Sequence, residues 1–414
     1  MGQKHRIRAF RGALEATYGV DAVPGADDAL LVTGDFTLTA NYDTVKWDPA
    51  RPFLGAAEEF PVGQSFSLSG QVDLAGSGTQ GVAPAWGKLL LPCGFAQTTV
   101  TGLATIQASP PTSSGTPAGG FTYTKQTAFA GELPRTVTLT CTTGGGSGVA
   151  AFTVAAPATS LDAAYNQAGV VMTDALAFAL PNAAEIVPTI TGPFTVGDTF
   201  TIKLMPPHVY YTPVSENFSS LSNYVHFSKK NHKLLGMRGN AQLVLDAKTL
   251  PKIKLDYLAL YGGILHEAAP PAVNLAAWKK PVPVNHVHTA MPLLHGHTAP
   301  MYAFTYNHGA KVTHIDLAGL EEVALTDREG TGSITIVDPT LQDWDYYASV
   351  RDVLLGGFSV IHGTTPGNIV AIEGVAAQVT KPRYDNKDGD IALGLDLTFQ
   401  PTDAGNDEIK IIVY

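Results

Sequence analysis

The sequence contains little cysteine and no long apolar run. Its two cysteines are Cys93 and Cys141, among 414 residues. Two thiols cannot build a disulfide framework, and we expect no bridge between them in a protein made in a reducing compartment. No run approaches the roughly 18 apolar residues that a membrane-spanning helix needs. We therefore expect neither a disulfide-stapled secreted scaffold nor a membrane protein.

Charge is sparse as well. Charged residues make up only 15% of the chain, and 36 acidic residues outnumber 26 basic ones, for a net charge of −10. A protein that grips nucleic acid by its phosphates needs clustered Lys and Arg, so this balance argues against such a surface. It suits a surface that must avoid holding a polyanion. The basic first stretch, MGQKHRIRAFRG, lacks the apolar core of a signal peptide. We interpret it as a flexible extension or a contact with an acidic neighbour.

Alternation of apolar and polar residues is the main pattern in the sequence. It is typical of half-buried strands and recurs in DFTLTANY (35–42), SFSLSGQVDL (65–74), RTVTLTC (135–141), NAQLVLDA (240–247), GSITIVD (332–338) and IALGLDLTF (391–399). Helical periodicity is confined to residues 84–95 and 341–357, and a glycine pair is expected to end the second helix. The predicted class is mainly β, with short flanking helices.

Composition shifts divide the chain. Residues 105–207 are rich in Ala, Thr, Gly, Ser and Pro and nearly free of charge, which predicts a small β domain inserted in a loop. Six prolines between residues 266 and 300 predict an extended connector that leads into a second unit. The expected organisation is a discontinuous first unit (1–104 and 208–265), the insert (105–207), the connector (266–300) and a second unit (301–414).

The two units share one order of predicted elements. Each has a strand, an acidic turn, a second strand, a short helix that contains Trp86 or Trp344, and a pair of hairpin strands that ends on a long strand. Identity between the units is low, so the order of parts carries this interpretation. It predicts a duplicated domain whose copies are related by a pseudo-symmetry axis.

Four segments carry a resemblance to a known family. They are ALEATYGVDAVPGADDALLV (13–32) and residues 45–95, 233–261 and 362–409. In order and extent they are similar to the tail tube (major tail) proteins of long-tailed, non-contractile bacteriophages. The insert lies outside this pattern and resembles the Ig-like decorations that such tubes carry. The resemblance implies a duplicated tail-tube β-sandwich or barrel fold, whose strands join a ring-wide sheet around a central channel.

The same resemblance implies a function and a set of partners. The chain would be a structural virion protein of the phage tail, assembled in the host cytoplasm into stacked rings that conduct DNA during ejection. Its first partner would be itself, as a homotrimer per ring, because two fold copies per chain let three subunits complete a pseudo-hexameric ring. Further partners would be the tail tip protein and the head-proximal terminator. Tape measure protein and DNA would pass through the lumen without sequence-specific binding, and no membrane would be involved.

Acidic residues occupy comparable places in the two units. We interpret them as acidic loops that face the lumen or a neighbouring ring. They are Asp43, Asp48, Glu58 and Glu59 in the first unit, and Glu321, Glu322, Asp327 and Glu329 in the second. Adjacent acids on a strand point to opposite faces, so acid–base catalysis by these pairs is disfavoured.

Histidines offer the main alternative. Six of the twelve fall within residues 284–316, including two His-x-His pairs, 286/288 and 295/297. On a strand each pair would share a face and could ligate one metal ion, but neither is followed by the carboxylate that a cupin-type site needs. We interpret these histidines as exposed polar faces or contacts between copies, with a metal site or a pH-sensitive contact as alternatives.

Other motifs give no catalytic signature. YDNKDGD (384–390) lacks the first aspartate of a calcium loop and predicts a hairpin turn, and TTGGGSGV (142–149) lacks the lysine of a phosphate loop. We expect no enzyme, no catalytic residue, no cofactor and no metal. Two other functions stay open: a carbohydrate-binding β-sandwich protein of the virion or cell surface, and a metal-dependent enzyme built on the histidines.

Overall fold

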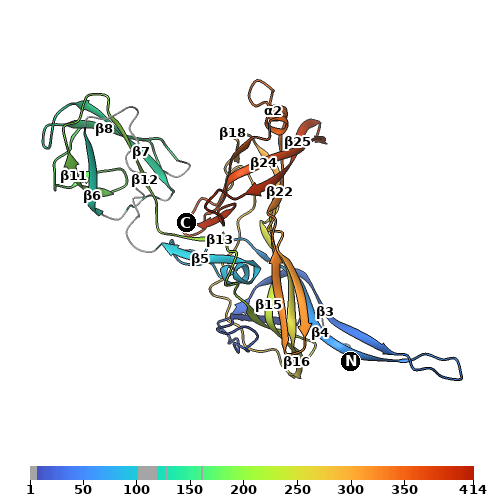
Figure 1. The fold of residues 1–414 in the computed structure, drawn as a ribbon. Helices are drawn as coiled ribbons and strands as arrows, with labels where there is room; N and C mark the ends of the chain where they lie inside the picture. The colour runs from blue at the N-terminus through green and yellow to red at the C-terminus, as the bar shows by residue number, and fades with distance from the viewer. Residues whose placement is uncertain (1–6, 101–118, 127–128, 130, 132, 160–161) are drawn as a thin grey trace.

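The computed structural model describes residues 7–100, 119–126, 129, 131, 133–159 and 162–414. It is mainly β, as the alternating segments predict, and its helices are short (Figure 1). In the described part of the chain, no helix is long and apolar enough to span a membrane. Residues 1–6 of the basic first stretch and 105–118 of the insert lie outside the described residues.

One large sheet takes up the described strands outside the insert, except for β20 (Lys311–Leu317) and β21 (Leu320–Asp327). It has 17 strands, β1 (Arg8–Leu14), β2 (Ala29–Leu30), β3 (Val32–Trp47), β4 (Glu58–Asp73), β5 (Phe95–Val100), β13 (His208–Pro213), β14 (Leu221–Phe227), β15 (Lys230–Asp246), β16 (Lys252–His266), β17 (Leu293–Leu294), β18 (His297–Thr298), β19 (Met301–Asn307), β22 (Thr331–Val337), β23 (Leu355–His362), β24 (Val370–Lys387), β25 (Asp390–Gln400) and β26 (Lys410–Val413). A separate hairpin is formed by β20 and β21.

Two sets of four strands within this sheet have the same order. In the first, β4 pairs with β16, β16 with β15, and β15 with β14, all antiparallel. In the second, β22 pairs with β25, β25 with β24, and β24 with β23, again antiparallel. An earlier strand flanks each set, because β3 pairs with β4 and β19 with β22. The two sets therefore agree in both chain order and pairing order.

The two sets are joined by backbone pairing. Strand β19 pairs with the end of β15 through residues 242–246, and β26 pairs with both β24 and β13. Figure 1 shows one set around β15 and β16 and the other around β22, β24 and β25. A single hydrophobic cluster contains buried residues of both sets.

The core follows the alternation of the sequence. In SFSLSGQVDL, the side chains of Phe66, Leu68, Val72 and Leu74 are buried, as period-2 alternation predicts. Trp86 is also buried and donates from its indole N–H to the Ala75 carbonyl at 2.6 Å, which removes the cost of leaving a buried donor unpaired. Full burial of such a side chain contributes on the order of 2–3 kcal/mol.

Residues of the insert form sheets of their own. Strands β6 (Gly120–Gln126), β10 (Phe178–Ala179) and β11 (Glu185–Thr191) make one sheet, and β7 (Arg135–Thr143), β8 (Ala151–Ala156), β9 (Tyr165–Val171) and β12 (Thr199–Leu204) make another. Their core is a separate cluster around Phe152, Phe194 and Phe200. Figure 1 shows these strands as a lobe beside the C-terminus, where Leu133 packs with Ile412 and Tyr414.

Both helices are shorter than the sequence predicts. Residues 84–95 contain only α1 (Gly87–Leu90) and a 3-10 turn, η1 (Leu91–Cys93). The prediction for 341–357 is wrong at its end, because α2 (Tyr346–Arg351) stops before Val353, whose φ is 52°. The glycine pair lies in β23 instead. A Cβ on Gly356 would come within 3.0 Å of the backbone Cα of His295, so this strand needs glycine for close packing.

The first stretch of the chain is also more ordered than predicted. Of the expected flexible extension, residues 8–12 belong to β1, which pairs with β14 and β2. Phe10 is buried in the main core, and the guanidinium groups of Arg8 and Arg11 lie over the rings of Phe36 and Tyr224. The buried side chain of Phe10 and the two cation–π contacts thus stabilise the basic first stretch, although its charge alone predicted a mobile segment.

Candidate functional site

A two-stranded hairpin projects from the large sheet. Strand β16 pairs with β4 only as far as Ser65, so residues 42–64 of the β3–β4 hairpin have no third strand. We call these residues the arm, and Figure 1 shows it reaching well beyond the rest of the molecule. An isolated two-stranded hairpin is marginally stable in water, so a partner surface would stabilise it.

The arm exposes large apolar side chains. Trp47 is 55% exposed and Phe53 is 66% exposed, and the whole set comprises Tyr42, Val45, Trp47, Phe53, Leu54, Phe60 and Val62. Val45 and Phe60 lie directly opposite each other on the two strands. Single exposed apolar residues are ordinary, but this many on one thin projection mark an interaction surface. Among the described strands β3 pairs only with β4, so its outer edge presents backbone groups that are free to pair.

The predicted acidic residues lie on hairpin strands, so their description as loops is wrong for most of them. Asp43 is in β3, Glu58 and Glu59 are in β4, and Glu321, Glu322 and Asp327 are in β21. Asp48 directly follows β3, and Glu329 lies between β21 and β22. All are exposed except Glu322, which is half-buried. Apolar residues alternate with these acids, so the strands continue through positions where the charges had predicted loops.

The arm and the β20–β21 hairpin meet at the base of the arm. The Oδ2 atoms of Asp43 and Asp316 each lie 3.3 Å from the position that a Cβ on Gly63 would occupy. The hairpin is anchored through Val323, whose amide donates to the Tyr18 hydroxyl and whose carbonyl accepts from Arg238 Nη1 at 2.9 Å. Carboxylates from two distant segments therefore lie close together at this point, which makes the local surface negative.

The histidine stretch differs from the prediction of exposed strand faces. His288 lies in a turn, where its amide donates to the side chain of Asn285, and His295 has a φ of 51° between β17 and β18. Neither His-x-His pair therefore shares the face of a continuous strand. His295 and His297 instead pack on the Trp344 ring, with ring-centre distances of 5.9 and 5.6 Å.

His308 is the clearest departure, because it is buried. Its ring lies 4.1 Å from the ring of Phe95, and its Nδ1 is 3.0 Å from the Tyr306 hydroxyl. Burial, and then the nearby charge of Arg328, lower the pKa of His308 to about 3. His314, at the surface, lies 3.1 Å from Glu321. In the described part of the chain, no group of three or more His, Cys, Asp or Glu side chains is placed to hold a metal ion.

The cysteines and the remaining motifs take structural roles. Cys93 and Cys141 are both free and buried, and burial raises the pKa of the Cys93 thiol to about 12, which suppresses its reactivity. The turn predicted for YDNKDGD joins β24 to β25, with Lys387 paired to Asp390, and the TTGGGSGV turn joins β7 to β8. Both turn predictions are confirmed.

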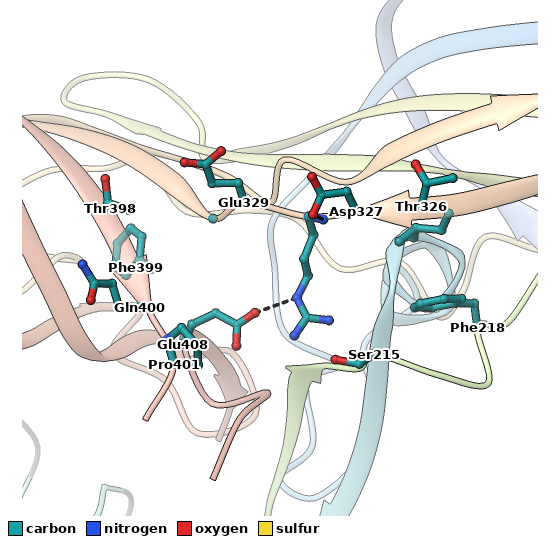
Figure 2. A pocket seen from close by; sticks show the side chains of 13 residues that line it. Ser215, Phe218, Thr326, Asp327, Glu329, Thr398, Phe399, Gln400, Pro401 and Glu408 are labelled. Atoms are coloured by element: carbon teal, nitrogen blue, oxygen red, sulfur yellow. Dashed lines mark hydrogen bonds and ion pairs between the residues drawn. The ribbon is translucent and has the colours of Figure 1, made fainter. Parts of the chain in front are cut away.

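A pocket lies where three connections converge. Its volume is about 530 Å³, and its walls come from Ser215 and Phe218 after β13, from residues 325–330, and from β25 and the segment that follows it (Figure 2). Arg328 and Glu408 form an ion pair there, with Nε 2.7 Å from Oε1, and both side chains are largely buried. The two residues are 80 positions apart, and no local pattern in the sequence indicated their contact.

Comparison with known proteins adds no family. No protein-family model matches the chain, and no curated protein matches its sequence. A conclusion about function therefore rests on the geometry of the molecule. Its main features are the arm with its apolar side chains, the adjoining acidic surface and the two sets of strands in the same order.

Proposed function

We propose that this chain is a structural virion protein that self-assembles into stacked rings and forms the tail tube of a long-tailed, non-contractile bacteriophage. The observation that carries the proposal is the arm, a projecting hairpin whose large apolar side chains are exposed in the single chain. A second copy provides such a partner in every ring, and an assembly of many copies covers every arm. The resemblance of residues 13–32, 45–95, 233–261 and 362–409 to tail tube proteins supports the same function.

The shared strand order supports three chains per ring. If the β4–β16–β15–β14 and β22–β25–β24–β23 sets descend from one duplicated fold, each chain supplies two of six equivalent positions. A homotrimer then closes a pseudo-hexameric ring, and the ring uses sheet edges that would otherwise invite uncontrolled pairing.

Charge supports a conduit for DNA. Each phosphate that the wall bound would release counterions and hold the DNA in place, so a lumen must present few cations. The chain carries a net charge of −10, and the acids of the arm and of β21 are the candidate lumen or inter-ring surfaces. DNA and tape measure protein would pass without specific binding, while tip and terminator proteins would cap the two ends. No catalytic residue or cofactor enters this function.

The insert fits a peripheral, Ig-like decoration. Its strands pair only with one another among the described residues, and its core is separate from the main one. A lobe of this size in the bore would block passage, so we place it on the outside of the tube. There it would be free to contact the surroundings of the virion.

Electron micrographs of negatively stained, purified protein test the function. We expect hollow tubes of uniform diameter with a regular axial repeat, formed without any other component. A monomer that stays dispersed at high concentration and binds glycans saturably would contradict the proposal and support the carbohydrate-binding alternative.

A further inference from the structure

The pocket of Figure 2 contains a buried carboxylate oxygen that has no partner in the protein. Glu408 is only 5% exposed, and its Oε1 accepts from Arg328 Nε, whereas its Oε2 is buried without a hydrogen-bond partner. A buried charged acceptor without a donor is costly, so such atoms in proteins are met by a water, an ion or a ligand. Glu408 lines the pocket, so this unpaired oxygen belongs to a side chain of its wall.

Arg328 is already engaged by the protein. Its Nε donates to Glu408, its Nη1 to the Val214 carbonyl and its Nη2 to Asn406 Oδ1. Three of the five guanidinium N–H donors thus have protein acceptors, one on each nitrogen, and the charge is paired with that of Glu408. The pocket therefore lacks the free cation that a phosphate or carboxylate ligand requires.

The remaining polar groups of the pocket are mainly acceptors. Asp327 and Glu329 add two carboxylates to that of Glu408; Asp327 is paired with Lys311 at 2.7 Å and Glu408 with Arg328, which leaves the charge of Glu329 uncompensated. Gln400 donates its side-chain NH₂ to Gln378 at 2.8 Å, which leaves its carbonyl oxygen as an acceptor. Phe218 and Leu325 supply apolar walls. A ligand that fits these groups carries hydrogen-bond donors, a positive charge and a short hydrocarbon part.

We propose that this pocket binds a small organic cation with a primary ammonium group, which donates to Glu408 Oε2 and places its alkyl chain against Phe218 and Leu325. An ammonium group offers three donors and compensates the excess negative charge of the walls. Because the pocket is built from segments around residues 215, 328 and 408, the bound cation also ties these connections together. The proposal does not depend on the tail tube function.

Calorimetric titration of the full chain with 1,4-diaminobutane tests the pocket. We expect one saturable site with a dissociation constant on the order of 1 mM, and weaker binding at high salt. The neutral probe 1,4-butanediol, which has the same chain length, should not bind. In Glu408→Gln the dissociation constant should rise about tenfold or more, because a charged acceptor is lost.

Two further variants complete the test. Asp338→Asn is the matched control, since Asp338 lines a different acidic pocket with Asp385 and Asp390, and its affinity should equal that of the original chain. If Glu408→Gln does not fold, Glu329→Gln decides, because this exposed carboxylate lines the same pocket and its loss should weaken binding about threefold. Equal binding of the diol, or unchanged affinity in the pocket variant that folds, would overturn the proposal. An equal loss in Asp338→Asn would also overturn it.

Discussion

Replacing Trp47, Phe53 and Leu54 of the arm by Ser should abolish tube formation and leave a folded monomer. These side chains are exposed in the single chain and contribute nothing to its core. Each large apolar side chain that is buried on assembly contributes about 1.5–3 kcal/mol, so the three together contribute on the order of 5 kcal/mol. Losing that amount weakens each contact by more than about a thousandfold. Sedimentation velocity and electron microscopy measure the loss directly.

A matched control lies in the insert. Val149, Leu176 and Val196 are exposed to a similar degree, between 60% and 65%, but belong to the lobe that we place outside the tube. Replacing all three by Ser should leave tube yield unchanged. The role of the arm would be refuted if its triple variant still formed tubes at the original protein concentration, or if both triple variants lost assembly equally.

Acidification from pH 6.5 to 4.5 should lower the free energy of unfolding by about 4–5 kcal/mol through His308 and His362, and further through His208 and His232, whose pKa values burial also lowers. Burial lowers the pKa of His308 to about 3 and, as the largest cause, that of His362 to about 4, whereas an unfolded histidine titrates near 6.5. The unfolded state therefore binds more protons in this window. The stability is fully present above pH 6.5 and is lost as the pH falls toward the folded pKa values. Each pH unit costs about 1.4 kcal/mol per buried histidine.

Urea unfolding at several pH values measures this loss. It is carried out on the monomeric variant in which Trp47, Phe53 and Leu54 are replaced by Ser. Aspartates with lowered pKa, such as Asp21 and Asp396, lose their contributions at lower pH, so the window isolates the histidines. In His308→Gln the pH-dependent loss should shrink by about 2 kcal/mol, the share of one buried neutral histidine over this window, while the exposed His286→Gln should leave it unchanged. A loss that stays the same in His308→Gln would show that this residue is not buried as a neutral ring.

The core strands were accessible from the sequence because alternation is a local property. Phe66, Leu68 and Val72 on β4, and Leu74 just after it, lie two or four residues apart, and their burial requires no knowledge of distant segments. The same reasoning found both turns and the mainly β class. It failed at residues 341–357, where periodicity continues past Arg351 but Val353 adopts a positive φ and Gly356 must pack against His295. Long-range packing there overrides local propensity.

The site was less accessible, because its features depend on distant contacts. His308 is buried by Phe95, more than two hundred positions away, so its burial left no signal among its neighbours. Trp47, Phe53 and Leu54 fall in a segment with prolines and glycine that is typical of a turn, and only the end of pairing with β16 shows that they project. A cluster of apolar residues within such a turn is the one local signal that would have indicated the arm.

Mass per ring tests the central claim most directly. Tubes assembled from the purified chain can be measured by mass per length together with the axial repeat, and the averaged end view gives the symmetry. If each chain contains two copies of one fold, each ring should have the mass of three chains. Its end view should then show six similar lobes around the lumen, with true threefold symmetry. A ring with the mass of six chains would contradict the duplication, and a chain that forms no ring would contradict the function.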